Sequence, residues 1–372
     1  MFMHFKQTVA LLALSLLSFA CKTSSPSEAA PLAHSFKPGA VWLDNRGVAI
    51  NAHGGGILEF GGTYYWFGEH KIEGKEGNFA HVGVHVYSSK DLYNWKDEGI
   101  ALAVSKDPQS EITAGCILER PKVIYNARTK KFVMWFHLEF KGNGYKTARS
   151  GVAVADQPTG PYQFVHSLRP NAGHLPAGLQ EDEDPKTQIY RRDLAVGQMA
   201  RDMTLFVDDD GIAYHIYASE ENKTLQIARL TDDYQRHSGQ YVRTFINRSM
   251  EAPAICKREG KYYLIASGCT GWKPNAARSA VADNILGPWK ELGNPTVGIN
   301  PQTGLGPEKT FGGQSTYILP VAGRPDAFIA MFDIWRPENA IDGRYVWLPV
   351  SFANGEFKVE WQDEWDLTRF SK

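Results

Sequence analysis

The stretch "GKYYLIASGCT", residues 260–270, decides the fold, because its pattern occurs five times along the chain. In each copy a turn precedes an aromatic, alternating strand, and a second strand with small polar residues follows. The other copies are "GGTYYWFGEH" (61–70), "KKFVMWFHLE" (130–139), "DGIAYHIYASE" (210–220) and "DAFIAMFDIW" (326–335). We interpret these stretches as the innermost strands of five repeated sheets.

Five meander sheets in succession predict an all-β, five-bladed β-propeller in a single domain over residues 37–372. A pair of β-sandwiches is the alternative, but five comparable units favour the propeller. The dipeptides Asp-Gly, Glu-Gly and Gly-Gly before several strands are typical of hairpin turns. Beyond the N-terminal apolar run, no stretch shows the period of an amphipathic helix.

The composition indicates a globular protein without a nucleic-acid-binding surface. Of the 372 residues, 43% are hydrophobic and 22% are charged, which excludes the composition of a disordered chain. Lys and Arg number 40 against 41 Asp and Glu, so the net charge is -1. The cysteines after position 21 do not have the spacing of zinc ligands.

The N-terminus predicts export. Residues 1–20 are typical of a signal peptide, because the apolar run at 9–20 is too short for a comfortable membrane span. Cys21 follows a small residue, as at a bacterial lipoprotein cleavage site, and is the predicted lipid attachment. Residues 21–36 then form a flexible tether. We expect a protein anchored by lipid to a bacterial membrane, in the periplasm or at the cell surface; an ordinary signal peptide is the alternative.

Three carboxylates stand just before β-rich runs in three different repeats. They are Glu119 in "LERPKVIYN", Asp202 in "RDMTLFVDDDG" and Glu251 in "EAPAICKREGKYY". Because the inner strands of a propeller converge on a central funnel, we expect these side chains to meet there. Close carboxylates raise one another's pKa, which suits acid catalysis near neutral pH. The cluster, without metal-ligand histidines, predicts hydrolysis of a glycosidic bond.

Each of these acids, and some nearby residues, also has a structural interpretation. An ion pair with Arg120 or Arg201 explains any one acid, but not three in phase with the repeat. The segment "VDDDG" (207–211) lacks the spaced ligands of a calcium loop and is interpreted as a turn. We therefore predict no cofactor and no catalytic metal, with a structural calcium as the alternative. His53 is either a hydrogen-bonded core histidine or a ligand of a water or an ion.

Five motifs together make the chain resemble glycoside hydrolase family 43, in its exo-β-1,3-galactanase branch, from about residue 41 to residue 361. They are "NAHGGGILEFGGTYYWFGEHK", "LERPKVIYN", "RDMTLFVDDDGIAYHIYASE", "EAPAICKREGKYYLIASGCTGW" and "GGQSTYILP". The resemblance implies a five-bladed propeller that inverts the anomeric centre. It also implies a polysaccharide or oligosaccharide partner, with galactose released from β-1,3-galactan, the backbone of arabinogalactan.

The resemblance assigns roles to particular residues. It implies that Glu251 is the general acid and that Asp202 tunes its pKa. The wider family has a base aspartate at the start of the first blade, where this chain reads "NAHG" (51–54). In the branch, Gln314 and Glu119 lie in the active site; we predict that Gln314 positions the water and that Glu119 assists as base or holds the galactose. Galactose contacts are implied for Glu69, Tyr145, Asn222, Thr270 and Trp272.

Two other functions fit parts of the sequence. A family 43 α-L-arabinofuranosidase or β-xylosidase is one, and the missing first-blade aspartate argues against it. An inactive, lipid-anchored glycan-binding protein is the other. That same absence favours it, whereas the retention of Glu251 with Asp202 argues against it. The polar segment 168–200 is predicted to shape the substrate entrance.

Overall fold

The computed structural model describes residues 1–2, 32–179, 188–353 and 356–370. Cys21, most of the predicted signal peptide and part of the segment 168–200 lie outside these residues. Helices in the described part are short, and none has the length and apolarity to span a membrane. They are η1 (Lys75–Asn78), α1 (Ile189–Arg192), η3 (Pro307–Gly312), η4 (Ala340–Asp342) and η5 (Leu367–Arg369).

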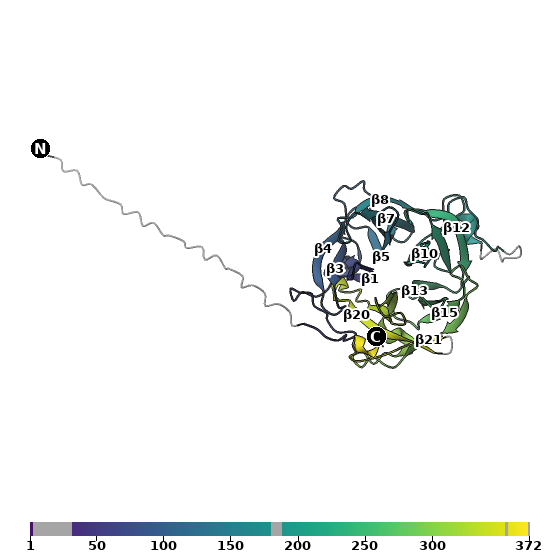
Figure 1. The fold of residues 1–372 in the computed structure, drawn as a ribbon. Helices are drawn as coiled ribbons and strands as arrows, with labels where there is room; N and C mark the ends of the chain where they lie inside the picture. The colour runs from purple at the N-terminus through teal and green to yellow at the C-terminus, as the bar shows by residue number, and fades with distance from the viewer. Residues whose placement is uncertain (3–31, 180–187, 354–355, 371–372) are drawn as a thin grey trace.

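The described residues form five antiparallel sheets arranged in a ring, which confirms the five-bladed β-propeller (Figure 1). The first sheet comprises β1 (His53–Phe60), β2 (Thr63–His70), β3 (Gly83–Ser89) and β4 (Lys96–Ala103). The second comprises β5 (Ile117–Asn126), β6 (Lys131–Glu139), β7 (Arg149–Ala155) and β8 (Gln163–Leu168). The third comprises β9 (Met203–Val207), β10 (Ala213–Ser219), β11 (Thr224–Leu230) and β12 (His237–Thr244).

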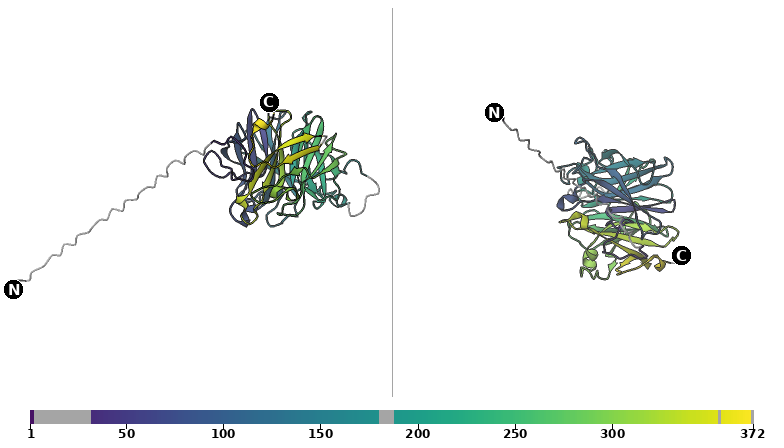
Figure 2. Two further views of the ribbon diagram at one scale, coloured as in Figure 1. Left: turned by 90° about the horizontal axis from the view of Figure 1, so that it is seen from below. Right: turned by 90° about the vertical axis from the view of Figure 1, so that its left-hand side faces the viewer.

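The remaining two sheets complete the ring, which Figure 2 shows from the side. The fourth comprises β13 (Met250–Arg258), β14 (Lys261–Gly268), β15 (Arg278–Ala282) and β16 (Lys290–Gly293). The fifth comprises β18 (Gln314–Pro320), β19 (Phe328–Ile334), β20 (Arg344–Ala353) and β21 (Glu356–Glu360), and β17 (Thr296–Val297) pairs in parallel with β21 at its edge. The innermost strands are β1, β5, β9, β13 and β18, which contact one another around the axis.

The identification of the innermost strands from sequence was wrong. The five aromatic stretches are the second strands of their blades, namely β2, β6, β10, β14 and β19. A second strand is covered by a neighbouring blade on each face, so it carries the strongest apolar run; in β6 every residue after Lys131 is buried. The innermost strands carry bulges, proline and cavity-facing polar residues, which weaken their apolar pattern.

Hydrophobic clusters fill the space between neighbouring blades and hold the ring together. One cluster lies at each of the five blade interfaces. A single blade leaves both apolar faces uncovered, so its burial depends on two neighbours. Each cluster contains a large buried side chain. Starting at the interface between the fifth and first blades and continuing around the ring, these are Trp66, Phe136, Trp135, Leu264 and Phe332.

The ring closes between the N-terminal segment and the C-terminal segment. Phe36 N–H donates to Trp365 O at 2.7 Å, and Trp365 N–H donates back to Phe36 O at 3.1 Å. Both rings are buried and pack together with centroids 4.5 Å apart. Packing of the propeller therefore includes Phe36, one residue before the predicted boundary at residue 37.

Bulges at the starts of the innermost strands set the direction of the axial side chains. The register shifts directly after His53 in β1, Glu119 in β5 and Glu251 in β13. The next residues, Gly54, Arg120 and Ala252, have φ of 61°, 57° and 54°. Such bulges bend a strand and change the direction of its side chains. At position 54 only glycine fits, since a Cβ there would lie 2.2 Å from Glu69 Oε1.

Candidate active site

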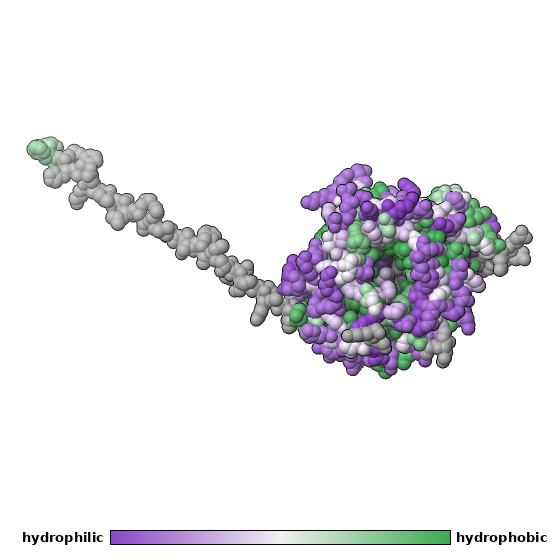
Figure 3. All heavy atoms as spheres, viewed as in Figure 1, coloured by the Kyte–Doolittle hydropathy of each residue, from purple (hydrophilic) through white to green (hydrophobic). Residues whose placement is uncertain are grey.

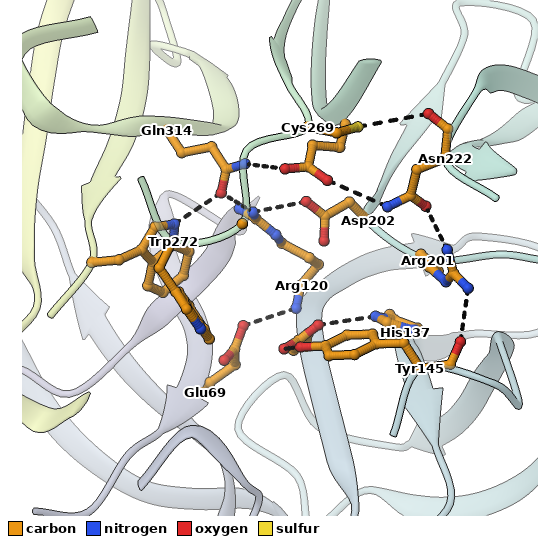
Figure 4. A pocket seen from close by; sticks show the side chains of 14 residues that line it. Glu69, Arg120, His137, Tyr145, Arg201, Asp202, Asn222, Cys269, Trp272 and Gln314 are labelled. Atoms are coloured by element: carbon orange, nitrogen blue, oxygen red, sulfur yellow. Dashed lines mark hydrogen bonds and ion pairs between the residues drawn. The ribbon is translucent and has the colours of Figure 1, made fainter. Parts of the chain in front are cut away.

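A cavity of about 340 Å³ lies where the innermost strands begin, and residues of all five blades line it (Figure 4). The ring is hollowed at its centre on the face seen in Figure 3. Because β5, β9, β13 and β18 all start at this end, residues far apart in sequence converge there. The lining residues are Glu69, Glu119, Arg120, His137, Tyr145, Arg201, Asp202, Asn222, Glu251, Cys269, Gly271, Trp272, Gln314 and Trp335.

Glu251, the second residue of β13, has the properties of a general acid. Burial raises its pKa, the charge of Asp202 adds to this, and the result is a pKa of about 7. Its Oε1 accepts a hydrogen bond from Gln314 Nε2 at 3.2 Å, and its Oε2 accepts from Asn222 Nδ2 at 3.4 Å. A carboxyl group with this pKa holds a proton at neutral pH and can still release it.

Arg120 connects several parts of the cavity. Its Nη2 donates to Asp202 Oδ2 at 2.9 Å and to Gln314 Oε1 at 2.5 Å, and its Nη1 donates to Ser315 O at 3.2 Å. The guanidinium also lies 5.2 Å from the centroid of Trp335. Asp202 is thus paired with an arginine of the neighbouring blade, and its charge stays beside Glu251.

Gln314, the first residue of β18, uses both ends of its amide. Oε1 accepts from Arg120 and also from Trp335 Nε1 at 2.8 Å, while Nε2 donates to Ser267 Oγ at 2.9 Å and to Glu251. Two N–H donors at one end fix which end is the carbonyl oxygen. To orient a water, this oxygen has to exchange one of its present donors for the water.

Glu119 lies across the cavity on β5 and is held by two partners. Tyr145 O–H donates to Oε1 at 2.8 Å, and His137 Nδ1 contacts Oε2 at 3.0 Å. Burial raises the pKa of Glu119, but the hydrogen bond and charge of His137 outweigh burial and lower it to about 2. Glu119 is therefore an anion at all ordinary pH values and a weak base.

Glu69 at the end of β2 adds a further carboxylate to the cavity wall. Its Oε1 accepts from the backbone N–H of Arg120 at 3.0 Å, and its Oε2 pairs with Lys71 Nζ at 2.8 Å. These contacts fix its orientation beside Gly54 and Trp335. Ligand atoms of Glu119, His137 and Asp202 lie within 4.8 Å of one another, and both ring nitrogens of His137 contact carboxylates in this structure.

Asn222 reaches Glu251 from a turn between β10 and β11. Three consecutive residues there, Glu220, Glu221 and Asn222, have φ of 53°, 58° and 61°. Arg201 Nη1 donates to Asn222 Oδ1 at 3.3 Å and Arg201 Nη2 contacts Glu221 Oε2 at 3.3 Å. The arginine thereby orients the amide so that its N–H group faces Glu251.

Aromatic side chains form the wall on the side of the fourth and fifth blades. The rings of Trp272 and Trp335 meet edge to face, with centroids 5.7 Å apart, and Trp272 is partly exposed. Thr270, although close in sequence, is not among the lining residues. Its Oγ1 donates to Lys273 O at 2.5 Å and accepts from Asn275 Nδ2 at 2.7 Å, so it shapes the loop that carries Trp272.

The segment 207–211 and His53, the two candidates for ion binding in the sequence, lie among protein groups that account for their positions. Asp208 in "VDDDG" accepts from Lys257 Nζ and Tyr262 O–H, both at 2.5 Å, as expected for a turn tied to the next blade. His53 is fully buried, and neither ring nitrogen has a hydrogen-bond partner among the described residues. Burial and the nearby charges of Lys71 and Arg344 lower its pKa to about 3. These positive charges disfavour a cation at His53.

Comparisons with known proteins place the chain in a family. Residues 53–313 match the profile of Glycosyl hydrolases family 43. The solved β-1,3-galactosidase BT3683, a family 43 protein with galactodeoxynojirimycin, is 52% identical over 89% of this chain and 100% of its own, with a TM-score of 0.84. The chain belongs to glycosyl hydrolase family 43. It is therefore an inverting glycosidase, and its resemblance to that family is confirmed.

Other family 43 structures are similar over less of their own length. An exo-β-1,3-galactanase from Phanerochaete chrysosporium with β-1,3-galactotriose is 31% identical over 90% of this chain and 68% of its own, with a TM-score of 0.74. One from Clostridium thermocellum is 35% identical over 89% of this chain and 66% of its own, with a TM-score of 0.75. No curated protein matches the chain.

The fold brings together all but one of the residues that sequence reasoning selected for this family 43 site. Sequence reasoning missed six further residues that line the cavity, namely Arg120, His137, Arg201, Cys269, Gly271 and Trp335. The two arginines had been weighed only as local ion-pair partners of adjacent acids. His137 had a signal, since it pairs in register with Glu119 across β5 and β6 and alternates with Glu139. Trp335 follows β19 and carries no local signal of its position.

Proposed function

We propose that this family 43 enzyme releases galactose from the non-reducing ends of β-1,3-galactan, with inversion of the anomeric carbon. The observation that carries the proposal is Glu251, whose pKa of about 7 and position beside Asp202, the partner of Arg120, are those of a general acid. The similarity to β-1,3-galactosidases and exo-β-1,3-galactanases supports the choice of substrate. Galactan of arabinogalactan is the polysaccharide partner that we propose.

In the proposed reaction Glu251 gives its proton to the glycosidic oxygen, and the bond from that oxygen to C1 breaks. A water attacks C1 from the opposite face and loses its surplus proton to solvent. We assign Gln314 to orienting this water and Glu119 to binding galactose hydroxyls, because a carboxylate with a pKa of about 2 accepts hydrogen bonds but is a weak base. Glu69, Tyr145, Asn222 and Trp272 are proposed galactose contacts.

Product analysis on linear β-1,3-galactan tests the proposal. We expect galactose as the product, appearing first as the α-anomer by NMR. Glu251→Gln should lower turnover by about 10²- to 10⁴-fold, because the amide has no proton to give. Glu59→Gln, an exposed change at the far end of β1, is the matched control and should leave turnover unchanged. First appearance of β-galactose, or full activity of Glu251→Gln, would overturn the assignment.

The reaction as proposed uses only side chains of this chain, so we propose that it needs no cofactor. Glu251 gives the proton, Gln314 orients the water and Glu119 binds galactose hydroxyls. Turnover should then be unchanged after dialysis against EDTA. A loss of activity that added calcium restores would contradict this.

We also propose that Cys21 carries a lipid and that the protein is exported to a bacterial membrane. The support is the apolar run before Cys21 and the polar segment after it. On this basis wild-type protein should partition with membranes and Cys21→Ser should remain in the soluble fraction. Equal partitioning of the two proteins would rule out the lipid.

A further inference from the structure

At the wall of the cavity, three side chains of the second blade form a continuous polar column that runs from the cavity into the blade. Glu119 lies on β5, and His137 pairs with it in register on β6. Glu139 lies two residues further along β6 and therefore faces the same side. His137 Nδ1 lies 3.0 Å from Glu119 Oε2, and His137 Nε2 lies 3.0 Å from Glu139 Oε1. His137 is thus placed between two carboxylates.

This placement determines the charge of the imidazole. A neutral imidazole has one N–H group and would direct a lone pair at one of the two carboxylates, whereas the imidazolium donates to both. Only 1% of the His137 side chain and none of the Glu139 side chain is exposed, so water does not replace either contact. Burial lowers the pKa of His137, but the hydrogen bonds of Glu119 and Glu139 outweigh it and raise the pKa to about 9.

Glu139 ties the column to a neighbouring loop. Its Oε2 accepts from the backbone N–H groups of Thr147 at 2.6 Å and Ala148 at 2.8 Å. This loop also carries Tyr145, whose hydroxyl donates to Glu119. The same buried carboxylate therefore supports both partners that orient Glu119.

From these contacts we propose that His137, clamped between Glu119 and Glu139, is a positioning residue that keeps Glu119 ionised and correctly oriented for galactose. The proposal rests on the proposed galactose-binding function of the cavity. His137 lines the cavity wall, but its side chain is only 1% exposed and both of its nitrogens contact carboxylates, so it acts through Glu119. The charged and titratable groups that face the column are Tyr145, Lys71, Arg201 and Asp202.

Galactose binding as a function of pH tests this role. In wild-type protein Glu119 should remain ionised from pH 8 down to pH 4. In His137→Gln the largest opposition to the burial of Glu119 is removed, and only Lys71 and Tyr145 still lower its pKa, so this pKa should rise into this range. Affinity for galactose, measured by calorimetry, should then fall by up to about tenfold for each pH unit below that pKa. At each pH the affinity of the variant is divided by that of the wild type, so that pH effects on groups other than Glu119, which both proteins share, cancel.

Steady-state kinetics separate this role from simple structural damage. His137→Gln should raise KM at low pH, while the fall of kcat above neutral pH, set by Glu251, stays in place. Glu139→Gln is the second variant, because it keeps the shape of the side chain and removes one charge from beside His137. It should show the same low-pH rise in KM to a smaller extent. If His137→Gln does not fold, the KM of Glu139→Gln tests the proposal in its place. If the ratio of the variant's KM to the wild-type KM does not change with pH, the proposal is overturned.

A direct measurement of the histidine does not depend on turnover or on galactose. With ¹⁵N-labelled histidine, the His137 ring should give the signals of an imidazolium at pH 7, assigned by their loss in His137→Gln or, failing that, by their shift in Glu139→Gln. A neutral ring at pH 7 would overturn the proposal. Wild-type protein that shows an imidazolium but binds no galactose would instead contradict the proposed function. The two failures are therefore distinguishable.

Discussion

Asp202 and Glu251 illustrate how one charge prepares another group for catalysis. Burial in the cavity already raises the pKa of Glu251, and the charge of Asp202 raises it further. Arg120 acts in the opposite direction on Glu251, yet it pairs with Asp202 and stabilises that charge. The pKa of about 7 is the balance of these effects, and Glu251 is protonated below it.

Replacing Asp202 with asparagine should move the pH dependence of the enzyme. Without the negative charge of Asp202, and with Arg120 left without this carboxylate as its partner, the pKa of Glu251 should fall by roughly one to two units. Because the acid has to be protonated, the decline of kcat/KM at high pH should begin at a correspondingly lower pH. A full pH profile measures this, with the exposed Asp210→Asn as control. An unchanged high-pH limb would contradict the role of Asp202.

The turn between β10 and β11 places Asn222 in the cavity by means of a strained backbone. Its three left-handed residues are strained, because side chains other than glycine rarely adopt positive φ. Glu220 anchors the turn: its Oε1 lies 2.7 Å from Arg243 Nε, and each side chain is 2% exposed. Arg243 also lies 4.1 Å from the ring centroid of Tyr190. This buried pair supports Asn222 in the cavity.

Arg243→Met should destabilise the protein strongly. The change leaves Glu220 buried without its cation, for which a loss of about 3–5 kcal/mol of unfolding free energy is expected. The double variant Arg243→Met with Glu220→Gln should recover part of it. Arg248→Met removes an exposed ion pair with Glu291 and should cost at most about 1 kcal/mol. Denaturant unfolding distinguishes these variants, and equal stability of Arg243→Met and Arg248→Met would contradict the argument.

The molecule as a whole is a closed ring whose blades stabilise one another. Every blade interface has its own apolar cluster, and the interface between the fifth and first blades also holds the contact between Phe36 and Trp365. Trp365 Nε1 donates to Trp347 O at 2.8 Å, so this side chain joins the C-terminal segment to β20. The cavity depends on the closed ring, because its walls come from all five blades.

Trp365→Ala should weaken ring closure and lower the unfolding free energy by about 3–5 kcal/mol, as for other buried aromatic truncations. Phe79→Ala, which removes a partly exposed ring, is the control and should change it by less than about 1 kcal/mol. Chemical denaturation gives both values. A Trp365 variant as stable as the Phe79 variant would show that the terminal segment does not hold the ring.

Much of the site was predictable because it follows the repeat. Glu119, Asp202, Glu251 and Gln314 each stand within two residues of the start of an innermost strand, and repeat phase identified three of them. The same pattern gave a wrong prediction of the innermost strands, because the most hydrophobic strand of each repeat was assumed to lie nearest the axis. It identified the second strands, which are covered on both faces by neighbouring blades.

Local sequence was sufficient to predict five blades and the convergence of the acids, because the alternation, the turns and the position of each acid in its repeat are visible within one blade. The charges of the cavity required the closed ring. Arg120 pairs with Asp202 of the next blade, and His137 acquires its charge from two carboxylates buried around it. Burial and distance between residues remote in sequence set these charges, and both quantities exist only once the blades have packed.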